Sequence, residues 1–404
     1  MIELILFSLL GIGIGIVTGL IPGMHVNNLI PILLTSSFFI SDPLSLSVMI
    51  ISIAVTQTFI QFIPSIFLGA PEEGTSLSVL PGHKLLFEGR GYEAVKLTVI
   101  GGIGSLLLTM FLVTIFSQYF QTFYTLSRPY IQYLLLFIIA AMIVSEKSSR
   151  KILYASSIIL MSGILGILIL NFQIVNQRFV LFPAFSGLFG LSTLISSVGQ
   201  NSKIPEQSEK EKMEVSKYQI IKSIFFGSIA GITVGFTPAV GVSQAATFFQ
   251  TVGGANEPRS FLLTLSGINV SNEFFSLISL FLIGNPRSGA SVAIQSILGD
   301  IGPSEIMILI STIIFSTGAA AILTLKLGKI IPSYLIKIDY KLLSFLVIIF
   351  ILSLITIFTG IFGLLICFTS TSLGLLSYHL GIKRSNCMGI LLIPSILFFS
   401  GIYF

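Results

Sequence analysis

Long apolar runs, such as residues 342–358 and 361–380, recur along the whole length of this chain. Each run is long enough to cross the hydrocarbon core of a bilayer, which is about 30 Å thick. In lipid, only helices and closed barrels satisfy all of their backbone hydrogen-bonding groups. Barrel strands alternate apolar and polar residues, and these runs do not. The sequence therefore predicts an all-α polytopic membrane protein in the cytoplasmic membrane.

Composition excludes several other classes of protein. Only 9% of the 404 residues are charged, against roughly a quarter in soluble domains. The net charge of +5 comes from basic residues in short loops, as the positive-inside rule predicts, so nucleic-acid binding is not implied. Cys367 and Cys387 lie in or beside apolar segments and suggest neither a disulfide framework nor a metal site. The N-terminus lacks a basic leader, and we expect it to be a retained helix.

Hydropathy predicts about six spans on each side of a polar connector. The connector, residues 199–217, has a high density of charged residues and no apolar period, so it reads as a cytoplasmic linker between a first transmembrane repeat, residues 1–198, and a second, residues 218–404. The expected spans are 2–20, 44–69, 94–119, 129–145, 152–171, 179–198, 218–236, 259–283, 303–325, 342–358, 361–380 and 386–403.

The two halves repeat each other when the first is shifted by 215 or 216 positions. Three blocks match in the same order: Gly11, Gly15, Gly19 and Pro22 with Gly227, Gly231, Gly235 and Pro238; residues 55–59 with 270–274; and residues 69–74 with 284–289. With the linker in the cytoplasm, the span count places most basic loops inside and the last two blocks on opposite sides. The sequence thus predicts inverted-topology repeats, which are usual in secondary transporters.

Each half also contains a short segment interrupted by glycine and proline, at residues 22–40 and 238–253. Such a segment either crosses the membrane as a broken helix or re-enters as a hairpin, and the sequence leaves both open. The helix starts after the prolines present N–H groups that favour an anion. We expect these residues to bind substrate: Pro22, Gly23, His25, Asn27, Asn28, Pro238, Gly241, Ser243 and Gln244. Gly11, Gly15, Gly227 and Gly231 are expected to pack helices closely.

A second polar group lies near the middle of two long apolar spans. Glu273 is the only carboxylate deep in such a span, and intramembrane ionisable groups are usually functional. We expect Glu273, with Asn272, Ser271 and Gln57, to bind a coupling sodium ion or proton. A protonated acid that bonds a neighbouring helix is the alternative.

Two matching loops follow these spans, and we name them the first Pro loop, residues 69–76, and the second Pro loop, residues 284–291. Arg287 in the second Pro loop can hold a carboxylate or phosphate with its guanidinium fork. It can equally form an ion pair with Glu72 or Glu73 of the first Pro loop.

Enzyme signatures are missing from the sequence. It has no His-Glu-x-x-His zinc pattern and no phosphate-binding Gly-rich loop ending in Lys-Ser or Lys-Thr. None of the three aspartates, Asp42, Asp300 and Asp339, is centred in a span. We therefore expect no catalytic residue, no metal and no organic cofactor.

These residues make the chain resemble the large permease subunit of tripartite tricarboxylate transporters. The resemblance rests on residues 19–28 and 235–244, on the two Pro loops with Gly302-Pro303, on residues 176–179 and on residues 380–384. His25, Asn27 and Asn28 stand where small hydroxyl residues are usual in that family. The resemblance implies a small carboxylate substrate, a small membrane subunit and an extracytoplasmic binding protein as partners.

Two functions remain from the sequence. The first is an ion-coupled permease for a small organic anion, working by alternating access. The second is a translocase of a polyprenyl-phosphate lipid carrier, because paired broken segments also suit a phosphate.

Overall fold

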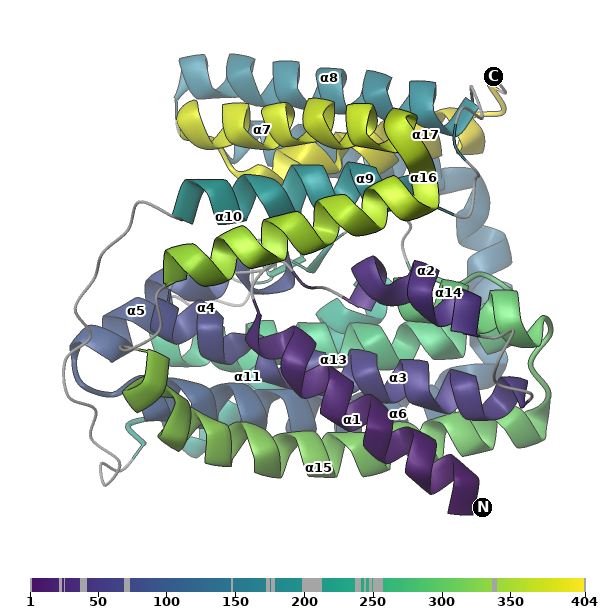
Figure 1. The fold of residues 1–404 in the computed structure, drawn as a ribbon. Coiled ribbons are helices and arrows are strands. Elements are labelled where there is room, and N and C mark those ends of the chain that lie inside the picture. The colour runs from purple at the N-terminus through teal and green to yellow at the C-terminus, as the bar shows by residue number, and fades with distance from the viewer. Residues whose placement is uncertain are drawn as a thin grey trace. The chain divides into compact units, whose positions relative to one another are not determined.

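The computed structural model of the 404-residue chain is mainly helical, with no strand among the described residues (Figure 1). It describes every residue except 1, 22–23, 25, 37–41, 69–72, 147, 172–174, 176–178, 198–212, 237–240, 243–244, 247–248, 250–256, 336–339 and 403–404. Within the described part, eight helices are long and apolar enough to span a membrane. The chain is therefore a multi-pass membrane protein, as predicted.

The first half of the chain contains α1 (Ile2–Leu20), α2 (Val26–Ser36), α3 (Pro43–Ile60), α4 (Phe62–Leu68), the 3-10 helix η1 (Glu73–Ser78), α5 (Val79–Phe87), α6 (Gly91–Ser127), η2 (Arg128–Tyr130), α7 (Ile131–Val144), α8 (Ser149–Asn171), α9 (Leu181–Phe185), the π-helical turn η3 (Ser186–Leu191) and α10 (Ser192–Ser197). The second half contains α11 (Lys217–Phe236), α13 (Pro258–Ile283), α14 (Gly289–Leu298), α15 (Pro303–Leu335), α16 (Tyr340–His379), η4 (Arg384–Met388) and α17 (Gly389–Phe399).

Helices lie at the positions of the expected spans, but three of them are shorter than predicted. The expected spans 129–145, 179–198 and 386–403 correspond to the shorter apolar helices Ile131–Val144, Leu181–Ser196 and Arg384–Phe399. The expected spans 342–358 and 361–380 lie in α16, which Gly360 divides into two helical parts. Gly360 has φ of 63° and ψ of −158°, a backbone conformation that only glycine adopts easily. This one residue therefore interrupts the helix without a loop.

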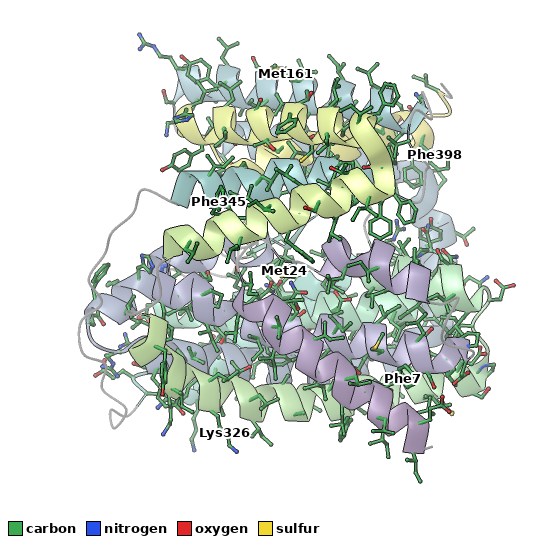
Figure 2. All side chains as sticks on the ribbon, in the orientation of Figure 1. Phe7, Met24, Met161, Lys326, Phe345 and Phe398 are labelled. Atoms are coloured by element: carbon green, nitrogen blue, oxygen red, sulfur yellow. The ribbon has the colours of Figure 1, made fainter. Side chains whose placement is uncertain are left out.

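Helix α1 illustrates how lipid reverses the usual distribution of residues. Its buried face consists mostly of small or hydroxyl side chains, namely Ser8, Gly11, Ile12, Gly15, Thr18 and Gly19. Large apolar side chains such as Ile5 and Leu9 are exposed. Figure 2 labels two further exposed apolar side chains, Met161 on α8 and Phe398 on α17. This pattern is expected where the surrounding solvent is apolar and small residues let helices approach closely.

The chain forms two compact units, and each takes helices from both halves of the sequence. Unit 1 comprises residues 1–121, 201–236 and 245–338, and unit 2 comprises residues 122–200, 237–244 and 339–404. This division differs from the predicted repeats, residues 1–198 and 218–404, which describe sequence similarity and stay a prediction. In unit 2, α8 packs against α17 and α16 packs against α9, η3 and α10.

Unit 1 contains two helix pairs that pack in the same register. A Cβ atom on Gly11 would lie 2.5 Å from the Met49 carbonyl oxygen, and one on Gly227 would lie 3.2 Å from the Thr264 carbonyl oxygen. Gly15 and Gly19 approach α3 one and two turns later, and Gly231 and Gly235 approach the matching residues of α13. The sequence repeat thus corresponds to repeated helix packing.

The same contacts fix the directions of the helices in each pair. Residue numbers rise together along α1 and α3, and along α11 and α13, so each pair is parallel. Leu20 lies near the level of Ile60, and Pro43 is 17 residues earlier, or about 25 Å along the axis. The end of α1 and the start of α3 therefore lie at different levels along the helix axis.

Candidate functional site

The start of α2 is held by a side chain from the middle of unit 1. Gln57 of α3 accepts a hydrogen bond from the Val26 N–H through Oε1 at 2.7 Å. Its Nε2 donates to the Met24 carbonyl at 3.2 Å. Helix starts leave N–H groups without intrahelical partners, so the Gln57 amide acts as a cap supplied by another helix. Its two bonds bracket position 25 within the broken segment.

Most residues of the predicted anion site lie outside the described part of the chain. These are Pro22, Gly23, His25, Pro238, Ser243 and Gln244. Asn27 and Asn28 lie in the first turn of α2, although their side chains are not described, and Gly241 is partly buried. Their role in binding an anion stays a prediction.

Glu273 lies on α13 and contacts the second Pro loop. Its Oε1 accepts a hydrogen bond from the Ser288 hydroxyl at 2.9 Å. Ser288 is the N-cap of α14, where its Oγ also accepts from the Ser291 N–H. Arg287 immediately precedes this cap, and its N–H donates to Ser291 Oγ at 3.2 Å. The structure thus places the predicted residue Glu273 against Ser288, which is the neighbour in sequence of the predicted residue Arg287.

Ser271 and Glu273 do not face the same point. Residues two apart on a helix differ by about 200° around its axis. Ser271 accepts a hydrogen bond from Thr109 of α6 at 2.9 Å, whereas Glu273 faces α14. Asn272 lies between them and is partly buried. The sequence predicted one cluster from adjacent positions. In the structure, however, the Ser271 hydroxyl bonds α6, whereas the Glu273 carboxylate bonds the start of α14.

Asn269 is a site residue that the sequence analysis missed. It precedes Glu273 by four positions and therefore shares its face of α13. The Asn269 Nδ2 donates to the Gly74 carbonyl, in η1 at the end of the first Pro loop, at 2.9 Å. The signal available in the sequence was an amide four positions, or one helical turn, before the carboxylate in the same apolar span.

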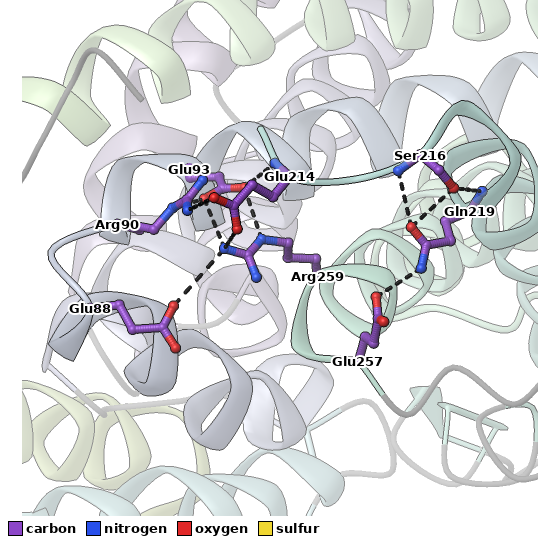
Figure 3. A network of polar contacts seen from close by, with 8 residues as sticks. All are labelled: Glu88, Arg90, Glu93, Glu214, Ser216, Gln219, Glu257 and Arg259. Atoms are coloured by element: carbon purple, nitrogen blue, oxygen red, sulfur yellow. Dashed lines mark hydrogen bonds and ion pairs between the residues drawn. The ribbon is translucent and has the colours of Figure 1, made fainter. Parts of the chain in front are cut away.

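A cluster of charged residues was also missed, and Figure 3 shows it at the start of α6. Glu93 has a side chain only 3% exposed and accepts from Arg90 and from Arg259 Nε, the latter at 3.0 Å. Glu214, which lies three residues before α11, is 2.7 Å from Arg90 and 3.4 Å from Arg259. Because Arg259 lies in the first turn of α13, the cluster joins segments from both halves of the chain within unit 1.

The charges in this cluster compensate one another. A hydrogen bond from Arg90 lowers the pKa of the Glu214 carboxyl below its ordinary value. The bond to Glu214 in turn raises the pKa of Arg90. The Glu214 N–H also donates to Glu93 Oε1 at 3.2 Å, so both the backbone and the side chain of this residue are held. This cluster therefore fixes the end of the linker to unit 1.

The described residues contain no group of three or more histidine, cysteine, aspartate or glutamate side chains arranged to hold a metal ion. Within unit 1, the Glu273 carboxylate lies beside the Ser288 hydroxyl at 2.9 Å.

Comparison with known proteins agrees with this architecture. The sequence profile of the tripartite tricarboxylate transporter TctA family matches residues 5–389. An uncharacterized protein of Methanocaldococcus jannaschii is 33% identical over 409 residues, covering 98% of this chain and 98% of that protein. No solved structure matches the chain.

Proposed function

The chain belongs to the tripartite tricarboxylate transporter TctA family, and on that premise we propose that it is an ion-coupled permease for a small organic anion. The family is one of membrane transporters, which agrees with the spanning helices. In this proposal a carboxylate crosses the cytoplasmic membrane by alternating access. The single observation that carries it is the polar middle of α13, where Glu273 bonds Ser288 at the start of α14 within a long apolar helix.

The start of α2 is the proposed anion site in unit 1. Gln57 satisfies the Val26 N–H and fixes the direction of this helix start. The next N–H groups of the first turn then remain for a ligand, and the helix dipole favours negative charge there. Backbone donors at a helix start hold a carboxylate without a buried cation. Asn27, Asn28 and His25 complete this proposal from the sequence.

Glu273 is the proposed coupling residue, with Asn272, Ser271 and Gln57 as the further residues that the sequence suggests. A carboxylate in a low-dielectric region needs a cation or a proton. Ser288 supplies a neighbouring hydroxyl oxygen at 2.9 Å. A sodium ion or proton that binds Glu273 would therefore act directly on the helix start of the second Pro loop.

Inverted repeats are proposed as the basis of alternating access. Helices α6 and α15 occupy the same place in the two halves, because each follows a Pro loop and one short helix. Gly328, near the end of α15, packs against Val95 in the first two turns of α6, and Lys329 lies over the Tyr92 ring at 5.1 Å. The end of one helix beside the start of its counterpart supports opposite directions for the two halves.

A thermal-shift screen of the purified protein tests the substrate class. The ligands are di- and tricarboxylates and a short-chain polyprenyl phosphate, each with sodium chloride or choline chloride. The proposal predicts stabilisation by a carboxylate that increases with sodium or with falling pH. Stabilisation by the polyprenyl phosphate alone would replace the permease proposal with a lipid-carrier translocase. The small membrane subunit and extracytoplasmic binding protein are proposed partners, to be tested by co-purification.

A further inference from the structure

One helical turn of α13 contacts both Pro loops. Asn269 Nδ2 donates to the Gly74 carbonyl at 2.9 Å. Glu273 accepts from Ser288 of the second Pro loop at the same distance. Residues four apart lie on one face of a helix and about 6 Å apart along its axis. The two loops, separated by more than 200 residues in the sequence, therefore rest on neighbouring positions of one helix.

The contact with the first Pro loop is close as well as hydrogen-bonded. A Cβ atom built on Gly74 would overlap with Asn269 Oδ1, so the loop backbone packs directly against the amide. Asn269 Nδ2 also donates to the Leu265 carbonyl at 3.0 Å, which fixes the side chain against its own helix. Asn269 is therefore a rigid support, and any side chain at position 74 would displace it.

Helix α3, which matches α13 in the first half of the chain, lacks the amide and the carboxylate that support the two loops. At the repeat offset of 215, Asn269 corresponds to Ala54 and Glu273 corresponds to Thr58. Alanine has no polar side-chain atom, and the Thr58 hydroxyl donates to the Ala54 carbonyl within α3 itself, at 2.8 Å. The support of both loops is thus asymmetric between the two halves, and α13 provides it.

We infer that the turn from Asn269 to Glu273 couples the two Pro loops, with Asn269 as the positioning residue of the first. This inference rests on the proposed role of Glu273 in binding the coupling ion. An ion or proton on Glu273 changes the bond to Ser288 and so the position of α13 relative to the second Pro loop. Because Asn269 is fixed to the same turn, this displacement reaches Gly74.

Hydrogen–deuterium exchange of the purified full-length protein tests the inference. Two peptides are followed, residues 73–80 and residues 284–291, in sodium chloride and in choline chloride at equal ionic strength. The proteins compared are wild type, Glu273→Gln as the neutral form of the carboxyl, Asn269→Ala, and the double variant. Thr58→Val is the matched control, since it occupies the position of Glu273 in α3 and should alter neither peptide.

The inference predicts that Glu273→Gln increases exchange in both peptides, and that Asn269→Ala increases exchange in 73–80 by about fivefold, the effect of one lost hydrogen bond. In the double variant the increase in exchange of residues 73–80 should equal that of Asn269→Ala alone, because the hydrogen bond from Asn269 to Gly74 is already absent. A response confined to 284–291 would overturn the coupling but leave the proposed ion site intact. No response in 284–291 to either sodium or Glu273→Gln would refute the ion site itself.

Discussion

Replacing Glu93 by glutamine tests whether the charged cluster in Figure 3 stabilises unit 1. The Glu93 side chain is 3% exposed, and its carboxylate accepts from Arg90, from Arg259 and from the Glu214 N–H. Glutamine keeps the shape of the side chain but removes its charge. Its NH₂ group can only donate, so it would face one of the N–H donors that now bond the carboxylate. Two guanidinium groups remain, and the largely exposed Glu214 lies 2.7 Å from Arg90 and 3.4 Å from Arg259.

The expected loss follows from these contacts. A hydrogen bond to a charged group contributes roughly 1.5 to 3 kcal/mol, and breaking a buried ion pair typically costs about 3 to 5 kcal/mol. Glu214 still neutralises part of the positive charge of the two arginines. We therefore expect a loss of about 3 kcal/mol in the free energy of unfolding, at the low end of the range for a buried ion pair. Glu88→Gln is the matched control. Glu88 is 42% exposed and 4.0 Å from Arg259, so its change should stay within about 0.5 kcal/mol.

The assay needs a probe inside unit 1, because Cys367 and Cys387 both belong to unit 2. Ser47 is fully buried in α3, and Ser47→Cys in a background without the two native cysteines provides that probe. Reaction of this thiol with a fluorescent maleimide during a detergent denaturation series reports the unfolding of unit 1. Equal losses for Glu93→Gln and Glu88→Gln would show that the cluster does not stabilise the protein in this way.

Three further changes have defined outcomes. Gln57→Leu should raise amide exchange at the start of α2 by roughly fivefold, since the Val26 N–H loses its acceptor; unchanged exchange would contradict the capping role. Gly15→Ala places a Cβ 2.7 Å from Thr56 and should destabilise the protein by about 1 to 3 kcal/mol in thermal unfolding. Gly13→Ala, which meets nothing within 4 Å, should be neutral or slightly stabilising, and equal effects of the two would refute close packing at Gly15. The pKa of Glu214 is lowered below its ordinary value of 4.5. Its bond to Arg90 therefore stabilises the folded protein fully above pH 4.5, and this stabilisation is lost as the pH falls through the lowered pKa. Amide exchange of residues 213–216, corrected for intrinsic rates, should therefore increase only below about pH 4.5, and an increase between pH 5 and 7 would contradict this assignment.

The spanning helices were predictable because apolar run length alone sets them in a bilayer. The glycine rows also predicted where α1 and α11 pack, since only small residues permit such close approach. The pairing of Asn269 with Glu273 was missed because adjacent residues were grouped, whereas helix geometry groups residues four apart. Glu93 and Arg259 were missed because charges near loops are usually solvated, and their burial depends on contacts between distant segments. The broken segments carry no pattern that decides between crossing and re-entry.

We propose that binding of an anion and binding of an ion at Glu273 are linked, and titration calorimetry measures this linkage. The carboxylate that stabilises the protein most in the thermal-shift screen is titrated at several sodium concentrations and at several pH values. The account predicts that its affinity for wild type rises with sodium or with protons, and that Glu273→Gln binds it with an affinity independent of both. The same ion dependence in both proteins, or none in wild type, would contradict the account.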